Sequence, residues 1–140
     1  MRAAAIDLGT VRVGLAVADE LGVMAHPRPF LPGGNIGQLV EALATLAESE
    51  GIELFVVGLP RNLDGREGPP ARRARRVANA LAQRTGRKVE LVDEWLSTRQ
   101  ARERLREQGL DDRAARQRVD SAAAAILLQT WLDGRKAAAP

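Results

Sequence analysis

A chain of 140 residues is long enough for one domain with a complete hydrophobic core, and it is too short for two domains that close on a cleft. It contains no cysteine, which excludes a disulfide framework and a zinc site made of thiolates. Its formal net charge of +3 fits a polyanionic partner, although a GC-rich codon bias would produce the same surplus of arginine and alanine.

The start of the chain predicts a β-hairpin followed by an edge strand. Residues 3–6 form a short apolar run, and residues 11–17 alternate in polarity after a Gly-Thr turn, as two antiparallel strands do. A third strand is expected at residues 25–31. It contains Pro27 and Pro29, which cannot donate to a strand ladder and therefore favour the edge of a sheet.

Helices and strands alternate in the next part of the chain. Residues 35–50 carry apolar side chains at helical spacing, between an asparagine N-cap and a glycine stop signal. The segment ELFVVGLP at residues 53–60 does not alternate, which predicts a central strand buried on both faces. A second helix that begins at prolines and ends at a glycine is expected at residues 69–86, and another strand at residues 88–94.

The last part of the chain predicts two more helices. Residues 96–109 contain a capping box formed by Ser97 and Gln100. A polar stretch at residues 110–118 then leads into the last helix, whose apolar stripe consists of Val119, Ala122, Ala123, Ile126, Leu127 and Trp131. Residues 135–140 are expected to form a frayed tail.

This order of elements predicts a single α/β domain over residues 1–134. The central sheet should be mixed, with the antiparallel N-terminal hairpin beside parallel strands, and with helices on both faces. Asp7 and Gly9 interrupt the apolar start of the chain, and the apolar run AAAAILL is far too short to span a membrane. We therefore expect a soluble cytoplasmic protein without a signal peptide or a membrane attachment.

Three acidic residues lie where such a sheet collects chemistry, near the carboxyl ends of its strands. Asp7 ends the first strand, Glu94 follows the last strand, and Asp120 lies at the start of the apolar stripe of the last helix. Taken singly, each has an ordinary explanation: a turn residue, a salt bridge to Arg99 and a helix cap, respectively.

Taken together, the three carboxylates indicate a metal site. They would repel one another, and a divalent cation is the simplest way to keep all of them ionised. Mg²⁺ and Mn²⁺ prefer oxygen ligands, and the chain offers no ligand set for zinc. The chemistry that this predicts is the attack of metal-activated water on a phosphodiester.

Four segments of the chain resemble the blocks of a known family. The segments AIDLGTVRVGLAVAD, VVGLPRNLDGREGP, LVDEWLST and RVDSAAAAILLQTWL are similar, in this order, to the YqgF/RuvX family of Holliday junction resolvases and pre-16S rRNA nucleases. The resemblance implies an RNase H-like fold and a metal-dependent endonuclease, with Asp7, Glu94 and Asp120 at the acidic positions of the family. It also implies maturation of the 5′ end of 16S rRNA, with Holliday junction resolution as the alternative.

The chain departs from the family pattern at Trp95, where an arginine usually follows the second acidic position. If that arginine contacts a phosphate, the contact is absent here or is made by a nearby residue such as Arg99. The indole of Trp95 has two possible roles, which are stacking on a base and internal packing.

Basic and polar residues around the loop RNLDGREG suggest contacts to a nucleic-acid backbone. This loop follows a buried strand and precedes a helix whose amide groups and arginines suit phosphate binding. The candidate contacts are Arg12, Asn62, Arg72, Arg73, Arg76 and Arg99. The expected partner is pre-16S rRNA or another RNA, with branched or single-stranded DNA as alternatives, and a monomer is favoured.

Two other functions fit part of the sequence. The segment DLGT resembles a phosphate loop of the sugar kinase and actin ATPases, but those proteins bind nucleotide between two domains and this chain supplies one. Val11 also stands where a small polar residue would approach a phosphate. A nucleic-acid-binding module without catalysis is disfavoured, because bare carboxylates repel phosphates.

Overall fold

The structure is a computed structural model that describes residues 2–9, 11–62, 64–93 and 112–138. For residues 112–121 and 136–138 it describes the course of the helix alone. The described part contains a five-stranded sheet in the order β3-β2-β1-β4-β5. Its strands are β1 (Ala3–Leu8), β2 (Arg12–Ala18), β3 (Ala25–Pro32), β4 (Leu54–Leu59) and β5 (Lys88–Asp93).

The N-terminal hairpin makes the sheet mixed. β2 runs antiparallel to β1 and to β3, whereas β4 runs parallel to β1 and to β5. The hairpin pairing continues to Asp7 opposite Gly14 and Leu8 opposite Val13, so β1 is longer than the predicted strand at residues 3–6. The predicted α/β fold with a mixed sheet is confirmed, and β3 with its two prolines lies at the edge as expected.

Local capping signals define the first two helices, α1 (Ile36–Glu50) and α2 (Pro69–Thr85). The Asn35 side chain accepts a hydrogen bond of 2.9 Å from the backbone N–H of Gln38. Gly51 and Gly86 end the two helices with positive φ angles of 68° each, the left-handed conformation that glycine adopts most readily. Both helices therefore lie where their sequence predicts them.

The last helix, α4 (Asp112–Ala138), is longer than its sequence suggests. It begins within the polar stretch at residues 110–118 rather than after it, and this stretch is rich in Ala, Arg and Gln, which are strong helix formers. It also continues through residues 135–138, in place of the expected frayed tail. The helix predicted at residues 96–109 lies outside the described residues.

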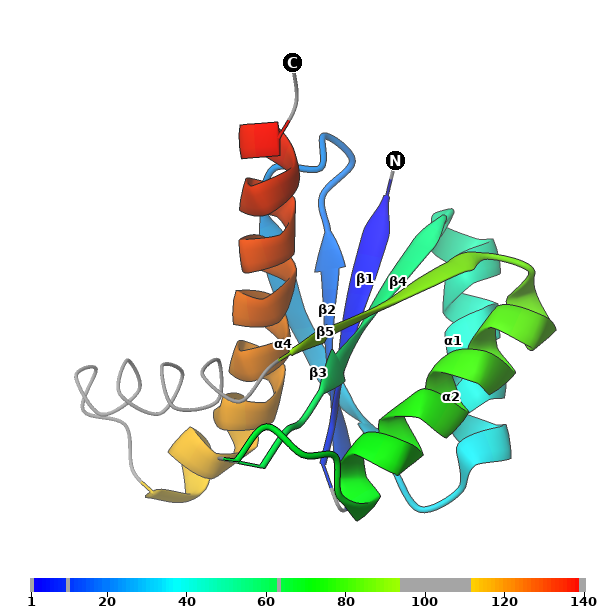
Figure 1. The fold of residues 1–140 in the computed structure, drawn as a ribbon. Coiled ribbons are helices and arrows are strands. Elements are labelled where there is room, and N and C mark those ends of the chain that lie inside the picture. The colour runs from blue at the N-terminus through cyan, green and yellow to red at the C-terminus, as the bar shows by residue number, and fades with distance from the viewer. Residues whose placement is uncertain (1, 10, 63, 94–111, 139–140) are drawn as a thin grey trace.

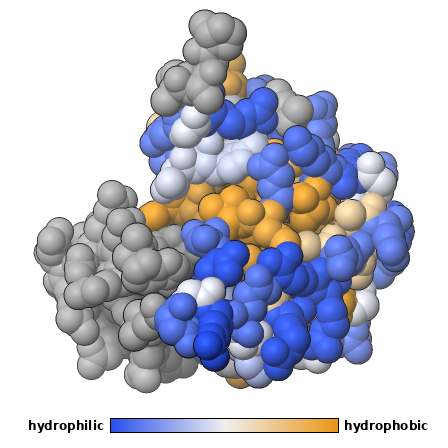
Figure 2. All heavy atoms as spheres, viewed as in Figure 1, coloured by the Kyte–Doolittle hydropathy of each residue, from blue (hydrophilic) through white to orange (hydrophobic). Residues whose placement is uncertain are grey.

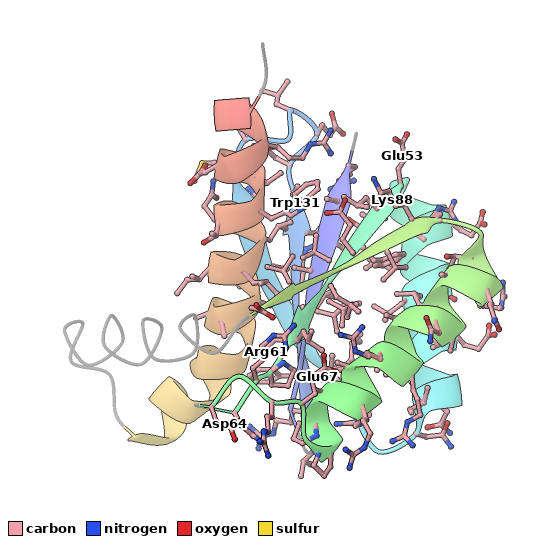
Figure 3. All side chains as sticks on the ribbon, viewed as in Figure 1. Glu53, Arg61, Asp64, Glu67, Lys88 and Trp131 are labelled. Atoms are coloured by element: carbon pink, nitrogen blue, oxygen red, sulfur yellow. The ribbon has the colours of Figure 1, made fainter. Side chains whose placement is uncertain are left out.

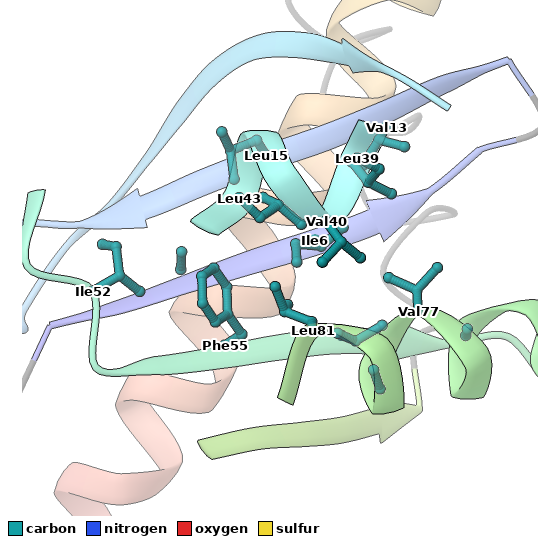
Figure 4. Close-up of a cluster of buried hydrophobic side chains, with 14 of the residues drawn as sticks. Ile6, Val13, Leu15, Leu39, Val40, Leu43, Ile52, Phe55, Val77 and Leu81 are labelled. Carbon is teal, nitrogen blue, oxygen red and sulfur yellow. The ribbon is translucent and has the colours of Figure 1, made fainter. Parts of the chain in front are cut away.

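The helices cover both faces of the sheet, as predicted. α1 and α2 lie on one face and α4 on the other (Figure 1). Ala4 and Ile6 of β1 belong to the larger core cluster, which packs against α1 and α2 and is drawn in Figure 4. Ala3 and Ala5 belong to the cluster that packs against α4. Because side chains alternate along a strand, the odd-numbered positions of β1 face α4.

β5 forms the second edge of the sheet and is covered less completely than β4. Every residue of β4 is buried, whereas the interior residues of β5 are half-buried. Figure 2 shows apolar side chains gathered across the middle of this face of the molecule, with hydrophilic side chains on both sides of them. No helix in the described part of the chain combines the length and the apolar character that a membrane span requires.

Candidate active site

Asp7 is the one polar or charged residue that is buried among the described side chains, with 7% of its surface exposed. It lies near the carboxyl end of β1, between the two neighbouring strands β2 and β4. It continues the odd-numbered series of Ala3 and Ala5, so it lies on the face that α4 covers. No hydrogen-bond or ion-pair partner for its carboxylate is present among the described residues. A carboxylate in such a position is costly unless a cation or a donor satisfies it, which suits a metal ligand.

The residue opposite Asp7 is a glycine. Gly14 of β2 pairs directly with Asp7, and directly opposed residues on antiparallel strands project to the same face. A glycine within a strand is typical of a place where a ligand or another backbone approaches closely. Gly14 itself therefore places no side chain beside the Asp7 carboxylate.

Asp120 lies on the helix that covers this face. It precedes Ala124 by one helical turn, and Ala124 is completely buried against the sheet. Because positions four residues apart share one side of a helix, we predict that Asp120 faces the sheet. The Asp120 side chain itself lies outside the described part.

Glu94 lies outside the described residues, immediately after the end of β5. Within β5, Glu90 accepts a hydrogen bond from Trp131 of α4, and Val92 packs in the cluster on the α4 side. Glu94 is the next even-numbered residue in the sequence.

Among the side chains that the structure describes, no group of three acidic or histidine residues is close enough to hold a metal ion. Two of the three predicted ligands fall outside that set.

An arginine clamps the loop before α2 to the end of β5. The Arg61 Nε donates a hydrogen bond of 2.6 Å to Asp93 Oδ1, and its Nη1 donates one of 3.3 Å to the carbonyl of Gly65. The same Nη1 lies 3.6 Å from Glu67 Oε2, and Glu67 also accepts two hydrogen bonds from Arg75. Figure 3 shows Arg61 and Glu67 at one end of the molecule.

This network has two consequences for the site. The hydrogen bonds from Arg75 hold the pKa of the Glu67 carboxyl below its ordinary value. The Asp93 carboxylate is half-exposed and is paired with Arg61. The sequence patterns did not single out Arg61 or Glu67. The available signal was that Arg61 and Asp93 follow or end neighbouring parallel strands, whose carboxyl ends meet at one edge.

Arg73 is engaged with the backbone rather than directed into solvent. Its Nη1 donates a hydrogen bond of 2.6 Å to the carbonyl of Gly9, and its Nη2 donates to the carbonyl of Gly33. A Cβ atom on Gly33 would lie 3.2 Å from the carbonyl oxygen of Val11 and 3.3 Å from Arg73 Nη2, so glycine fits this crowded position. Arg73 thus joins α2 to the turn after β1 and to the segment after β3.

The other predicted nucleic-acid contacts are distributed around α2 and the sheet edge. Arg72 and Arg76 are exposed on α2, one turn apart, and Asn62 is exposed in the loop before it. Arg12 is also exposed, with its guanidinium 5.6 Å from the centre of the Phe30 ring. Arg99 lies outside the described residues.

The first turn of α2 offers fewer amide donors than its sequence suggests. Pro69 and Pro70 occupy the first two helical positions and have no N–H group, and the Arg72 N–H already donates to Gly68. Phosphate binding at this end would therefore depend on arginine side chains more than on the helix terminus.

The fold of this chain belongs to a known structural class. The mixed sheet, with helices on both faces, matches Thermus thermophilus RuvC in complex with a Holliday junction substrate, with a TM-score of 0.62 and 21% identity over 97% of this chain and 96% of that chain. This match establishes the fold, which is RNase H-like.

The sequence comparisons identify the family within that class. The family model described as RuvX: Holliday junction resolvase matches residues 1–134, and the chain belongs to this family. A relative from Anaeromyxobacter sp. strain Fw109-5 is 50% identical over 98% of this chain and 100% of its own length. One from Myxococcus xanthus is 40% identical over 97% of this chain and 90% of its own. Both are named "Putative pre-16S rRNA nuclease".

Proposed function

We propose that this chain is a divalent-metal-dependent endonuclease that hydrolyses phosphodiester bonds in the maturation of the 5′ end of 16S rRNA, in the cytoplasm. The observation that carries the proposal is the buried carboxylate of Asp7, which lies near the carboxyl end of β1 on the face of α4. The names of the relatives support rRNA as the substrate. The family description supports a four-way DNA junction as the second candidate.

The proposed metal ligands are Asp7, Glu94 and Asp120. Their oxygen ligands suit Mg²⁺ or Mn²⁺. When bound, such an ion stabilises the charge that develops on the phosphate oxygens during hydrolysis. Asp7 contributes a carboxylate whose backbone is held in the middle of the sheet by strands on both sides, so its position changes little between the free and the bound protein.

The chain's basic side chains would hold the substrate beside this edge. Arg72 and Arg76 are the contacts that the geometry favours, because both are exposed on the same side of α2. Arg12, Asn62 and Arg99 remain candidate contacts. Arg73 would act indirectly, since its guanidinium holds the turn after β1 in place.

A direct experiment separates the two substrates. Purified protein is incubated with Mn²⁺ or Mg²⁺ and either a precursor fragment of 16S rRNA or a four-way DNA junction, with the Asp7→Asn variant as control. We expect cleavage of the RNA by the parent protein and none by the variant. Symmetric paired nicks in the junction, with no cleavage of the RNA, would instead support the resolvase. Equal cleavage by parent and variant would refute the proposed site.

A further inference from the structure

A cavity lies at the amino ends of β4 and β5, whereas Asp7 lies near the carboxyl end of β1. This cavity of about 300 Å³ is lined by Leu54, Lys88, Glu90, Trp131 and Arg135. Leu54 and Lys88 are the first residues of β4 and β5, and Trp131 lies near the end of α4. Figure 3 shows Lys88 and Trp131 toward one end of the molecule, and Arg61 and Glu67 toward the other. The proposed hydrolysis uses none of these lining residues.

The lining side chains are held in a fixed arrangement. The Trp131 Nε1 donates a hydrogen bond of 2.6 Å to Glu90 Oε2, and the Lys88 ammonium lies 3.3 Å from the other oxygen of the same carboxylate. The Arg135 guanidinium lies over the indole, 4.8 Å from its ring centre. Trp131 is therefore restrained both at its edge and at its face, so little rotamer freedom remains to be lost on binding.

This combination of groups fits one class of ligand. A planar indole, an apolar floor and two cations, of which one is a planar guanidinium, are groups that bind an unpaired base together with its phosphate. The carboxylate of Glu90 is already used by Trp131 and Lys88, which reduces its repulsion of a phosphate. The volume lies at the lower end of the range for ligand pockets, which suits one base.

The helix α4 connects this cavity to the proposed metal site. Positions 120 and 131 are eleven residues apart on α4, which is a separation of about 16 Å along the helix axis. Stacked nucleotides rise about 3.4 Å each, so about five of them span this separation. One bound strand is therefore long enough to reach from the acidic edge to Trp131.

We propose that the Trp131 cavity binds an unpaired base of the same nucleic-acid strand that is cut at the acidic edge, a few nucleotides away from the scissile phosphate. This inference rests on the proposed nuclease function and deepens it. The site would give the protein a preference for substrates with a single-stranded extension. Binding at this site would also fix the number of nucleotides between that extension and the cut.

The test uses the full-length Asp7→Asn protein, in which we expect cleavage to be disabled. The measured quantity is its affinity for a single-stranded RNA of 12 nucleotides and for one of 4 nucleotides. Trp131→Leu should weaken binding of the longer RNA by about tenfold or more, because it removes the aromatic face on which a base stacks. It should leave affinity for the shorter RNA as in its parent. Trp131→Phe should restore most of the lost affinity, since it keeps an aromatic face.

A matched pair of charge variants tests the cations. Lys88→Gln removes a charge at the cavity, and Arg87→Gln removes one from the neighbouring residue, whose guanidinium pairs with Glu48 instead. We expect Lys88→Gln alone to weaken binding of the longer RNA and to reduce the salt dependence of its affinity. A single-stranded DNA of the same length, measured in parallel, shows whether the cavity distinguishes RNA from DNA.

The outcomes separate this inference from the nuclease proposal. The inference is overturned if the Trp131→Leu variant binds the longer RNA with the same affinity as its parent. It is also overturned if the variant loses affinity equally for both RNA lengths and melts at a lower temperature, because Trp131 then only packs α4. When Trp131→Leu is the only substitution in the protein, a raised KM for the RNA without a comparable fall in kcat supports the inference. Length-dependent binding through Trp131 without any cleavage by the parent protein would support the cavity and refute the nuclease.

Discussion

At the scale of single residues, Asp7 and Asp93 lie in different environments, although Asp93 ends β5 and Asp7 is one residue from the end of β1. Asp7 is buried on the α4 face, opposite a glycine, without a partner among the described residues. Asp93 is half-exposed and accepts a hydrogen bond from Arg61. Carboxylates that are alike in sequence context are thus expected to differ in function, and amide substitutions test that difference.

Amide substitutions of the three proposed ligands should each abolish most of the activity. We expect Asp7→Asn, Glu94→Gln and Asp120→Asn to lower kcat by more than about a hundredfold, and double variants to cost little more, because residues that act as a unit are not additive. The metal-free Asp7→Asn variant should melt no lower than the parent, since the change removes a buried charge. Single-turnover cleavage and thermal melts measure both effects.

Asp93→Asn is the control for these variants. It weakens an exposed ion pair to Arg61, so we expect a loss of about 0.2–1 kcal/mol in the free energy of unfolding and a small change in kcat. A larger loss of activity for Asp93→Asn than for Glu94→Gln would show that Asp93 is the ligand.

At the scale of elements, ion pairs and arginine clamps fix how helices and strands are joined. Glu50, the last residue of α1, accepts hydrogen bonds of 3.0 and 2.7 Å from Arg28 of β3. Arg2, which precedes β1, lies 3.4 Å from the same carboxylate and donates to the backbone carbonyl of Glu50. One carboxylate therefore joins the end of α1 to two strands.

The stability of this junction should depend on pH. The hydrogen bonds from Arg28 hold the pKa of Glu50 below its ordinary value of 4.5, so folding is favoured by its ionised form. This contribution is present above that value and is lost as the pH falls through the lower pKa of the folded state. Glu50→Gln should therefore unfold at lower urea concentration than the parent at pH 7. The difference should shrink as the pH falls below 4.5, and a difference that does not change with pH would contradict this.

The arginines of α2 should separate into binding and structural groups. Arg72→Gln and Arg76→Gln should weaken RNA binding and lower the slope of log affinity against log salt by about 0.7–0.9 for each phosphate that the variant no longer neutralises. Arg73→Met should lower the free energy of unfolding by about 1–3 kcal/mol, because it leaves two backbone carbonyls without their donor. Titrations at several salt concentrations and urea denaturation distinguish the groups. An unchanged salt slope for Arg72→Gln would show that this side of α2 is only solvated.

At the scale of the whole molecule, the proposed acidic site lies at the carboxyl ends of the parallel strands, and the Trp131 cavity lies at the amino ends of β4 and β5. A four-way junction is cut symmetrically by two active sites, which requires two copies of such a domain. A single copy suffices for linear RNA. The oligomeric state therefore bears directly on the substrate.

Cleavage should require Mg²⁺ or Mn²⁺ and should occur in the monomer. Chelation should abolish activity, and Ca²⁺ should support binding with little cleavage, because its coordination is larger and less regular. We expect sedimentation to show a monomer that cleaves RNA. Robust cleavage by metal-free protein in chelator would exclude the metal site, and a stable dimer that makes paired nicks would favour the junction.

Much of the fold follows from local sequence. Asn35 and Gly51 delimit α1 because a side-chain cap and a left-handed glycine act within a few residues of the chain. The apolar run of β4 requires burial on both faces whatever its neighbours are. The predicted strand ends and the apolar stripe of the last helix singled out the three acidic residues, and the family resemblance implied the same positions. The order of strands and helices predicted the α/β class.

Only the tertiary structure determined which residues far apart in the chain contact one another. Arg73 belongs to the same arginine-rich run as Arg72, yet its partners lie 64 and 40 residues away along the chain. Arg61 and Asp93 are separated by 32 residues. Which face of β1 carries α4, and hence which face Asp7 occupies, depends on packing between elements. Alternation within a strand distinguishes its two faces, but only the packed helix determines which of them is covered.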